Sequence, residues 1–324
     1  MSKSTPLVSY NTLNKALSKS ESVATTDQVL KETDPAEAAA MMASMNFALA
    51  KLEEASQGRD EKVIVSTDHR VASLLQTYLG KEARDAGSIE RIGTDIHGRD
   101  QYEAKFDDKD YVAWAKSFFT WWKGIIDHPW LDNPQTKKFN NQARLALLGD
   151  WGTGMYGAPL SAKSIEDDQE GYALRLHLGD VYYSGDKDEV QDRFLDIWPK
   201  NHTGDEINRA CNSNHEMYTG GHAYFNYTLS AFNQSASYFA LENDHWVLAG
   251  LDTAYKEKDL KEDQVTWLTD LVNNAHGRRI LLFSHHQPFS PWSSKRLPQR
   301  AHTSYSSLAT ALSFWRCITF DAFR

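Results

Sequence analysis

The second half of the chain alternates short apolar runs with polar loops that carry glycine. Runs rich in Leu, Val and Ile predict buried strands over 144–150, 173–180, 235–241, 245–252 and 278–284. Asn243 and Asp244 stand between the third and fourth runs, where a tight turn would join two antiparallel strands. Residues 259–277 carry apolar positions at helical spacing and end on Gly277, as an amphipathic helix does. Strands that alternate with helices predict an α/β sandwich.

The first 140 residues show a different pattern. Residues 1–30 are rich in Ser, Thr, Asn and Lys, which predicts a flexible lead-in. A helix is expected to begin at Asp34, with Pro35 in its first turn. Its apolar stripe consists of Met41, Met45, Leu49 and Leu52. For residues 60–80 the pattern allows either a strand or a helix.

A second helix is expected over 109–126, ending before Pro129. Its aromatic face, which we expect to pack this region onto the rest of the chain, consists of Tyr111, Trp114, Phe118, Trp121 and Ile125. From these patterns we expect the chain to consist of three parts: a lead-in over 1–30, a mainly helical region over 31–140 and an α/β region over 141–324.

Charge and composition narrow the partners. The 324 residues include 35 Lys and Arg against 44 Asp and Glu, a net charge of −9, which disfavours nucleic acid and anionic membranes. Cys211 and Cys317 are the only cysteines, so no disulfide framework holds the fold. The N-terminus lacks the apolar segment of a signal peptide and no apolar run is long enough to span a bilayer. We therefore expect a cytoplasmic protein.

Polar side chains gather where the strands are expected to end. Asp150 and Asp180 each follow a glycine at the end of a strand-like run, residues 214–216 follow a further run, and His285 and His286 follow the last. Ligands of open α/β sheets bind at the carboxyl ends of strands, so these residues are expected to converge. Carboxylates, an amide, a phenol and imidazoles form a mixed oxygen and nitrogen set that suits Fe, Mn or Zn better than Ca²⁺.

With these motifs, the segment 144–290 resembles the calcineurin-like metallophosphoesterase superfamily. The pattern of that superfamily is D-x-[GH], G-D-x-x, G-N-H-[DE], a strand-end His and a final G-H-x-H. Two details are most similar to the purple acid phosphatase branch: Gly152 follows Asp150 at the third motif position, and Tyr183 falls where that branch carries an iron-binding tyrosine. The resemblance implies two packed sheets flanked by helices.

The resemblance also implies a site with two metal ions, either divalent or Fe(III) with a divalent partner. Asp150 and Tyr183 would bind the first metal, Asp180 would bridge both, and Asn214 with His285 would bind the second. His286 is the close alternative to His285, and packing is the alternative for Tyr183. The implied reaction is phosphoester hydrolysis by a metal-bound hydroxide, on a phosphorylated small molecule or a phosphoprotein.

Two histidines have expected roles beside the metals. His215 resembles the family histidine that contacts the substrate phosphate or protonates the leaving group, and orienting Asn214 is its alternative role. Glu216 is expected to brace His215. His222 follows in a glycine-rich loop and is a candidate for substrate binding, with an incidental loop histidine as the alternative.

The sequence departs from the family pattern in two places. Ser213 replaces the glycine that precedes Asn214, which would cost about 1 kcal/mol if the position needs a positive φ. No G-H-x-H follows His286, and the only later histidine is His302, so the catalytic domain is expected to be incomplete at its C-terminus. Two other hypotheses therefore stay open. The chain is either a non-catalytic module that binds a phosphate ligand or a protein, or an interaction protein that acts through residues 1–135.

Overall fold

The computed structural model describes residues 5–9, 12, 43, 47, 50, 67–105, 117–118, 120–155, 157–200, 203–256 and 259–287, and the backbone of 315–319. Of the helix expected after Asp34, only Ala43, Phe47 and Ala50 are described, and all three are helical. Its methionine stripe, the start of the helix at 109, His302 and the side chain of Cys317 lie outside the described residues.

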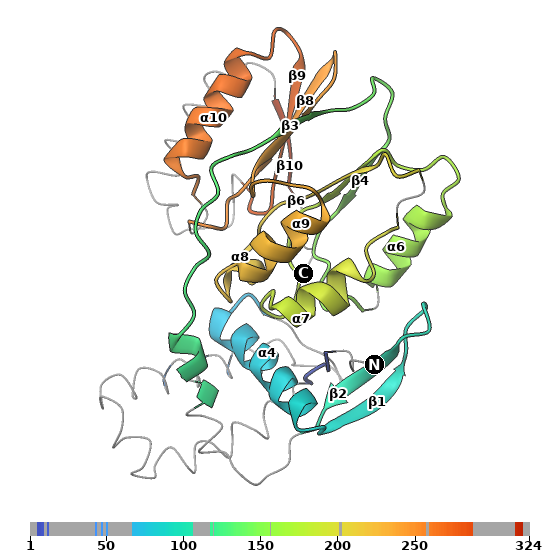
Figure 1. The fold of residues 1–324 in the computed structure, drawn as a ribbon, viewed down its shortest axis with the longest axis vertical. Coiled ribbons are helices and arrows are strands. Elements are labelled where there is room, and N and C mark those ends of the chain that lie inside the picture. The colour runs from blue at the N-terminus through green and yellow to red at the C-terminus, as the bar shows by residue number, and fades with distance from the viewer. Residues whose placement is uncertain are drawn as a thin grey trace.

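Two sheets form the centre of the molecule, and all five strands expected from the sequence lie in them (Figure 1). One sheet is parallel and consists of β4 (Leu145–Leu148), β5 (Leu174–His177) and β6 (Ile207–Ala210). The other sheet has the order β10-β9-β8-β7-β3. Its strands are β3 (Thr136–Lys138), β7 (Phe239–Glu242), β8 (Trp246–Leu251), β9 (Arg279–Ser284) and β10 (Trp315–Thr319). The antiparallel hairpin expected at Asn243 and Asp244 joins β7 to β8. The mixed α/β class is thus confirmed.

The inner faces of the two sheets share one apolar core. Leu174 and Leu176 of β5 pack in the same cluster as Leu241 of β7, Leu248 of β8 and Phe283 of β9. The alternation of side chains along a strand sends the intervening residues of β5 to its other face. That face is covered by a second cluster, which includes residues of several helical segments.

Helices cover the outer faces of the sheets. On the β4-β5-β6 side, α6 (Gly157–Asp167) contributes Ala158 and Ala162, and the short α7 (Lys187–Val190) contributes Val190. On the other side, α10 (Glu262–Asn273) packs Leu268 against the outer face of β8. Shorter helical segments complete the region: α8 (Asn214–Met217), α9 (Leu229–Ala231) and single π-helical turns at Gln191–Leu195 and Tyr224–Thr228.

His177, the last residue of β5, is buried among aromatic rings. Its ring centroid lies 4.3 Å from Phe194, 5.8 Å from Trp198 and 6.0 Å from Trp151. Its Nε2 has no hydrogen-bond partner within the described part of the chain. Burial lowers the pKa of His177 to about 3, because the imidazolium would lose its hydration there.

We expect this histidine to make the protein acid-sensitive. Below pH 6.5, the usual histidine pKa, the unfolded chain binds a proton that the folded chain rejects until about pH 3, so stability falls as pH falls through this window. When the pH is lowered from 6.5 to 4.5, the free energy of unfolding should fall in both proteins, but by about 2 kcal/mol less in His177→Leu than in the wild type. Urea titrations at each pH measure the difference. His97→Leu, at an exposed histidine, should keep the wild-type slope, and a His177→Leu slope equal to it would contradict the account.

The N-terminal region differs from the helical expectation. Residues 70–80, in the stretch where strand and helix were both allowed, form the first part of the helix α4 (Arg70–Asp85). It is followed by an antiparallel hairpin of β1 (Ile89–Thr94) and β2 (Asp100–Ala104), so the region is not mainly helical in its described part. The expected helix before Pro129 is helical up to Lys123, and its Phe118 and Trp121 pack on Tyr78 of α4.

Residues 5–9 correct the expectation of a flexible lead-in. Every one of them is buried, and Leu7 pairs with β2 through hydrogen bonds to Tyr102 and Ala104. Arg193 donates to the Pro6 carbonyl at 2.8 Å, which ties this segment to the α/β region. Among the described helices, none is long and apolar enough to cross a membrane.

Candidate functional site

The carboxyl ends of β4, β5, β6 and β9 bring four of the expected site residues to one edge of the sheets. Asp150 follows β4, Asp180 follows β5, Asn214 follows β6 and His285 follows β9. Asp150 has φ 48° and Asp180 has φ 74°, a left-handed conformation that costs a non-glycine residue about 1–2 kcal/mol. Such strain persists where the surrounding structure imposes it, most often at functional sites.

The ring of His285 lies close to two side-chain oxygen atoms, one of Asn214 and one of Asp180. The Nε2 atom of His285 lies 2.9 Å from Oδ1 of Asn214 and 3.3 Å from Oδ1 of Asp180. The Nδ1 atom of His285 lies 3.0 Å from the Leu178 carbonyl, which can only accept, so Nδ1 carries the proton. In the neutral imidazole, Nε2 then presents a lone pair to two oxygens that also present lone pairs. A cation, either a proton on Nε2 or a metal ion, satisfies all three.

The amide of Asn214 is oriented by a tyrosine. Tyr218 donates its hydroxyl proton to the backbone carbonyl of Asp68, so its oxygen is left to accept from Nδ2 of Asn214 at 2.8 Å. This places the donor end of the amide on Tyr218 and leaves Oδ1 facing His285. The acceptor end of Asn214 is therefore the end presented to the site.

Asp180 is buried and only partly satisfied. Its Oδ2 accepts from the hydroxyl of Tyr182 at 3.3 Å, whereas its Oδ1 is a buried atom without a hydrogen-bond partner in the described structure. Burial alone would raise the pKa of Asp180, but the neighbouring His285 and His215 lower it, and the net pKa lies well below the usual carboxyl value. Asp150 is within hydrogen-bonding reach of the same carboxyl. An ionised, buried oxygen of this kind favours a bound cation.

Ser213 and Glu216 hold the Asp180 loop from behind. The backbone N–H of Asp180 donates to Oγ of Ser213 at 3.1 Å, and Ser213 in turn donates to Glu216. Ser213 has φ −132°, so it does not carry the cost of about 1 kcal/mol that a positive φ would impose. Its side chain caps the N-terminus of α8. Burial and the charge of Asp180 raise the pKa of Glu216 to about 7. Glu216 thus braces Ser213 and Asp180 rather than His215.

Gly179 leaves room for the site, and replacing it should damage the site. It has φ +106°, and a Cβ there would lie 2.6 Å from Cβ of Ser213 and 3.0 Å from Nδ1 of His285. Gly179→Ala should lower the free energy of unfolding by about 1–3 kcal/mol more than Gly87→Ala and weaken metal binding. Gly87 is the matched control, since it also has a positive φ but no atom within 4 Å of the added Cβ. Equal losses in denaturant titrations of the two variants would contradict this packing.

His215 is fully buried beside the loop that carries Asp180 and Tyr182. Its Nδ1 donates to the Tyr183 carbonyl at 2.5 Å, and its ring packs on Tyr182 with centroids 4.2 Å apart. Its Nε2 lies 3.6 Å from a carboxylate oxygen of Asp68. Burial would lower the pKa of His215, but the charges of Asp180 and Asp68 raise it further, and the net pKa lies above the usual histidine value. The raised pKa favours the protonated imidazolium form, which is the form that a general acid needs.

Asp68 is a site residue that the sequence does not reveal. It precedes α4, stands 147 positions before His215 in the chain, and belongs to no motif. Only the packing of α4 against the strand-end loops brings it to the site, through contacts such as Lys81 with Asp186 and Thr77 with Ser184. A lone aspartate before a helix is an ordinary sequence feature.

Two adjacent tyrosines, Tyr182 and Tyr183, direct their hydroxyl groups to different partners. Tyr183 is buried on the far side of the loop, where its hydroxyl accepts from the Val8 N–H at 3.1 Å and its ring stacks under Arg193. The structure therefore places the Tyr183 hydroxyl at the Val8 backbone and does not bring it to Asp180 as the expected metal ligand. The hydroxyl that reaches Asp180 belongs to the neighbouring Tyr182, which donates to Oδ2 of Asp180 at 3.3 Å.

The two remaining histidines differ in position. His286 lies beside His285 with ring centroids 4.8 Å apart, and its Nδ1 is 3.0 Å from the Thr253 carbonyl at the end of β8. His222 is exposed, and its Nε2 lies 3.0 Å from the Ile126 carbonyl while its ring packs on His128. His222 thus faces a different loop, and the structure does not bring it to Asp180 as a substrate-binding residue.

Comparison with known proteins assigns no family to this arrangement. No family model matches the chain, and no curated protein matches it either. Within the described residues, no group of three His, Cys, Asp or Glu side chains meets as a metal-ligand cluster. The candidate site instead consists of Oδ1 of Asp180, Nε2 of His285 and the amide oxygen of Asn214. Its two oxygens and one nitrogen fit one Fe, Mn or Zn ion by their chemistry.

Proposed function

We propose that this protein is a metal-dependent phosphoester hydrolase, a phosphatase or phosphodiesterase, with a sandwich of the metallophosphoesterase type. The observation that carries the proposal is the position of His285 Nε2, which lies close to both Asn214 Oδ1 and the buried Oδ1 of Asp180, an atom with no hydrogen bond among the described residues. The position of this set, at the carboxyl ends of strands from two packed sheets, supports the same assignment.

The residues present suggest two adjoining cation positions that share Asp180. Asn214 and His285 would hold one ion, and Asp150 with Tyr182 would hold the other. When bound, two such ions lower the pKa of water toward neutrality and offset the charge of the phosphate oxygens. Hydrogen bonds hold these proposed ligands in position before a metal binds. Nδ1 of His285 contacts the Leu178 carbonyl, Nδ2 of Asn214 donates to the Tyr218 hydroxyl, and the backbone N–H of Asp180 donates to Oγ of Ser213.

His215 is the proposed general acid. Its Nδ1 proton is held by the Tyr183 carbonyl, so the proton available for transfer is the one on Nε2. Asp68 stabilises that proton from a position that is 64% exposed, at the solvent side of the buried imidazole. In the proposed reaction, Nε2 gives this proton to the leaving alkoxide as the bond from oxygen to phosphorus breaks.

A hydrolysis assay tests the function. The full-length protein should hydrolyse p-nitrophenyl phosphate or its bis-ester when supplied with Mn²⁺, Fe or Zn²⁺, and a chelator should remove the activity. If metal binds tightly but neither ester is hydrolysed, the non-catalytic binding module becomes the better account. Activity that survives the chelator would contradict a metal-dependent reaction.

A further inference from the structure

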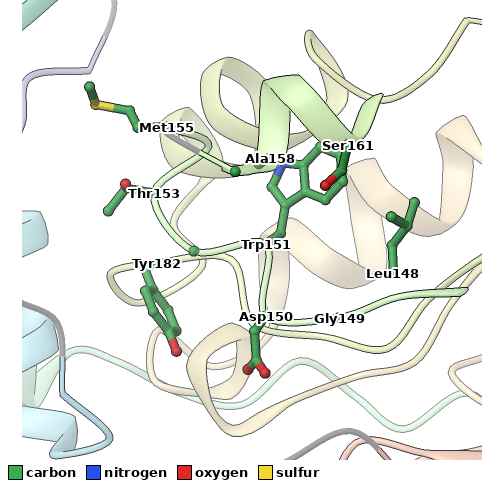
Figure 2. A pocket seen from close by; sticks show the side chains of 11 residues that line it. Leu148, Gly149, Asp150, Trp151, Thr153, Met155, Ala158, Ser161 and Tyr182 are labelled. Atoms are coloured by element: carbon green, nitrogen blue, oxygen red, sulfur yellow. The ribbon is translucent and has the colours of Figure 1, made fainter. Parts of the chain in front are cut away.

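A cavity of about 350 Å³ adjoins the candidate site (Figure 2). It is lined by the end of β4, the glycine-rich loop after it, the first turns of α6 and one residue of the next strand-end loop. Two of its lining residues, Asp150 and Tyr182, are also the ones that reach Asp180. Figure 2 shows the carboxylate of Asp150 and the hydroxyl of Tyr182 on the same side of the loop. The cavity therefore begins where a reacting phosphate would lie.

The loop that forms the cavity is held in place by the core. Gly152 donates to the Asp180 carbonyl at 3.0 Å and accepts from Tyr182 at 2.9 Å, which joins the two strand-end loops. The indole of Trp151 donates to the Arg193 carbonyl at 2.8 Å. Gly154 packs so closely that an added Cβ would lie 2.2 Å from that same carbonyl oxygen. A cavity with such fixed walls is already formed before a ligand binds, which limits the entropy cost of binding.

The lining indicates the kind of group that fits. The side chains of Leu148, Trp151, Met155 and Ala158 are apolar, and those of Thr153, Ser161 and Tyr182 carry hydroxyls. Among the described residues that line the cavity, Asp150 carries the only formal charge. A leaving group with further phosphates would meet this carboxylate, and the part of the lining that the structure describes holds no Lys or Arg to offset the repulsion. A neutral group with an apolar face meets no such penalty.

We infer that this cavity binds the leaving group of the ester, and that the substrate is a small phosphoester of a neutral, partly apolar alcohol. The inference rests on the proposed function, since the phosphate must lie at Asp150 and Asp180. The volume of about 350 Å³ is near the lower end of ligand pockets, which span about 300–1,000 Å³. It suits a small molecule rather than a segment of a phosphoprotein.

Binding of non-hydrolysable phosphonates tests the inference without relying on turnover. Titration calorimetry of the Mn²⁺-loaded protein should show phenylphosphonate binding about tenfold or more tightly than methylphosphonate, because the ring buries apolar surface in the cavity. Ser161→Phe, at a lining residue exposed on α6, should remove most of that difference and leave methylphosphonate binding unchanged. Leu160→Phe is the matched control, since Leu160 is 59% exposed and does not line the cavity.

Each other outcome overturns a definite part of the account. Equal binding of the two phosphonates, or equal effects of Ser161→Phe and Leu160→Phe, would overturn the leaving-group pocket while the proposed function stands. A phosphonate-bearing peptide that binds more than tenfold tighter than phenylphosphonate would overturn the small-molecule substrate. Binding of neither phosphonate by protein that holds Mn²⁺ would overturn the proposed function and the inference together.

Discussion

Asp180→Asn is expected to abolish metal-dependent hydrolysis and to weaken metal binding more than about 100-fold. The substitution keeps the shape of the side chain but removes its negative charge. In the wild type, that charge lies on a buried carboxyl whose Oδ1 has no hydrogen bond within the described part of the chain and lies 3.3 Å from Nε2 of His285. Because both proposed cation positions share this carboxyl, its loss should affect the whole site. Calorimetric titration with Mn²⁺ and a p-nitrophenyl phosphate assay measure the two effects.

Asp186→Asn provides the matched control for this prediction. Asp186 lies six positions later in the same loop, but its side chain caps α7 and pairs with Lys81 at 3.3 Å. An asparagine can still cap a helix, so this variant should bind metal as the wild type does. If Asp180→Asn binds Mn²⁺ with unchanged affinity, Asp180 is not a metal ligand. Unchanged phosphonate binding in that variant would favour the non-catalytic module.

His215→Asn is expected to lower the hydrolysis rate of an alkyl phosphate by about 10²–10⁴-fold. The rate for p-nitrophenyl phosphate should fall far less, because p-nitrophenolate departs without a proton. Asp68→Asn should show the same selectivity with a smaller loss, since it removes the carboxylate 3.6 Å from Nε2 of His215 and not the acid itself. The ratio of kcat for the two esters measures this selectivity. A residue that only supports the fold would change both rates alike.

Two control variants separate this role from a general loss of structure. His222→Asn changes a histidine of the same region that contacts the Ile126 carbonyl, and it should leave the ratio of the two rates unchanged. Asp85→Asn removes an exposed carboxylate at the other end of α4 and should do the same. A ratio that stays at the wild-type value in His215→Asn would remove His215 from the reaction.

The strands and their polar ends could be predicted because the evidence is local. The apolar runs of β4, β5 and β9 are followed within one to three residues by the side chains at the edge of the sheets, those of Asp150, Asp180 and His285. Once the runs are taken as strands of packed sheets, the meeting of Asp180, Asn214 and His285 follows from topology. The sequence could not show the helix α6 as clearly, because Gly157 and Pro159 in its first turn weaken the helical pattern.

The sequence-based predictions fail where the position of a side chain depends on contacts with residues far away in the chain. Tyr182 and Tyr183 are adjacent and chemically identical, and only the burial of the second against Val8 and Arg193 decides which hydroxyl faces Asp180. That burial in turn requires residues 5–9, whose polar surroundings in the sequence suggest a flexible segment. Asp68 is invisible for the same reason, because its position depends on how α4 packs on the loop of Ser184 and Asp186.

Metal content of the purified protein is the most direct test of the central claim, that Asp180, Asn214 and His285 form a cation site. After incubation with Mn²⁺, Fe or Zn²⁺ and removal of free metal, elemental analysis of the full-length wild type should find two ions per chain, and Asp180→Asn should find none. A wild-type chain that retains no metal under conditions where it remains folded would contradict the account.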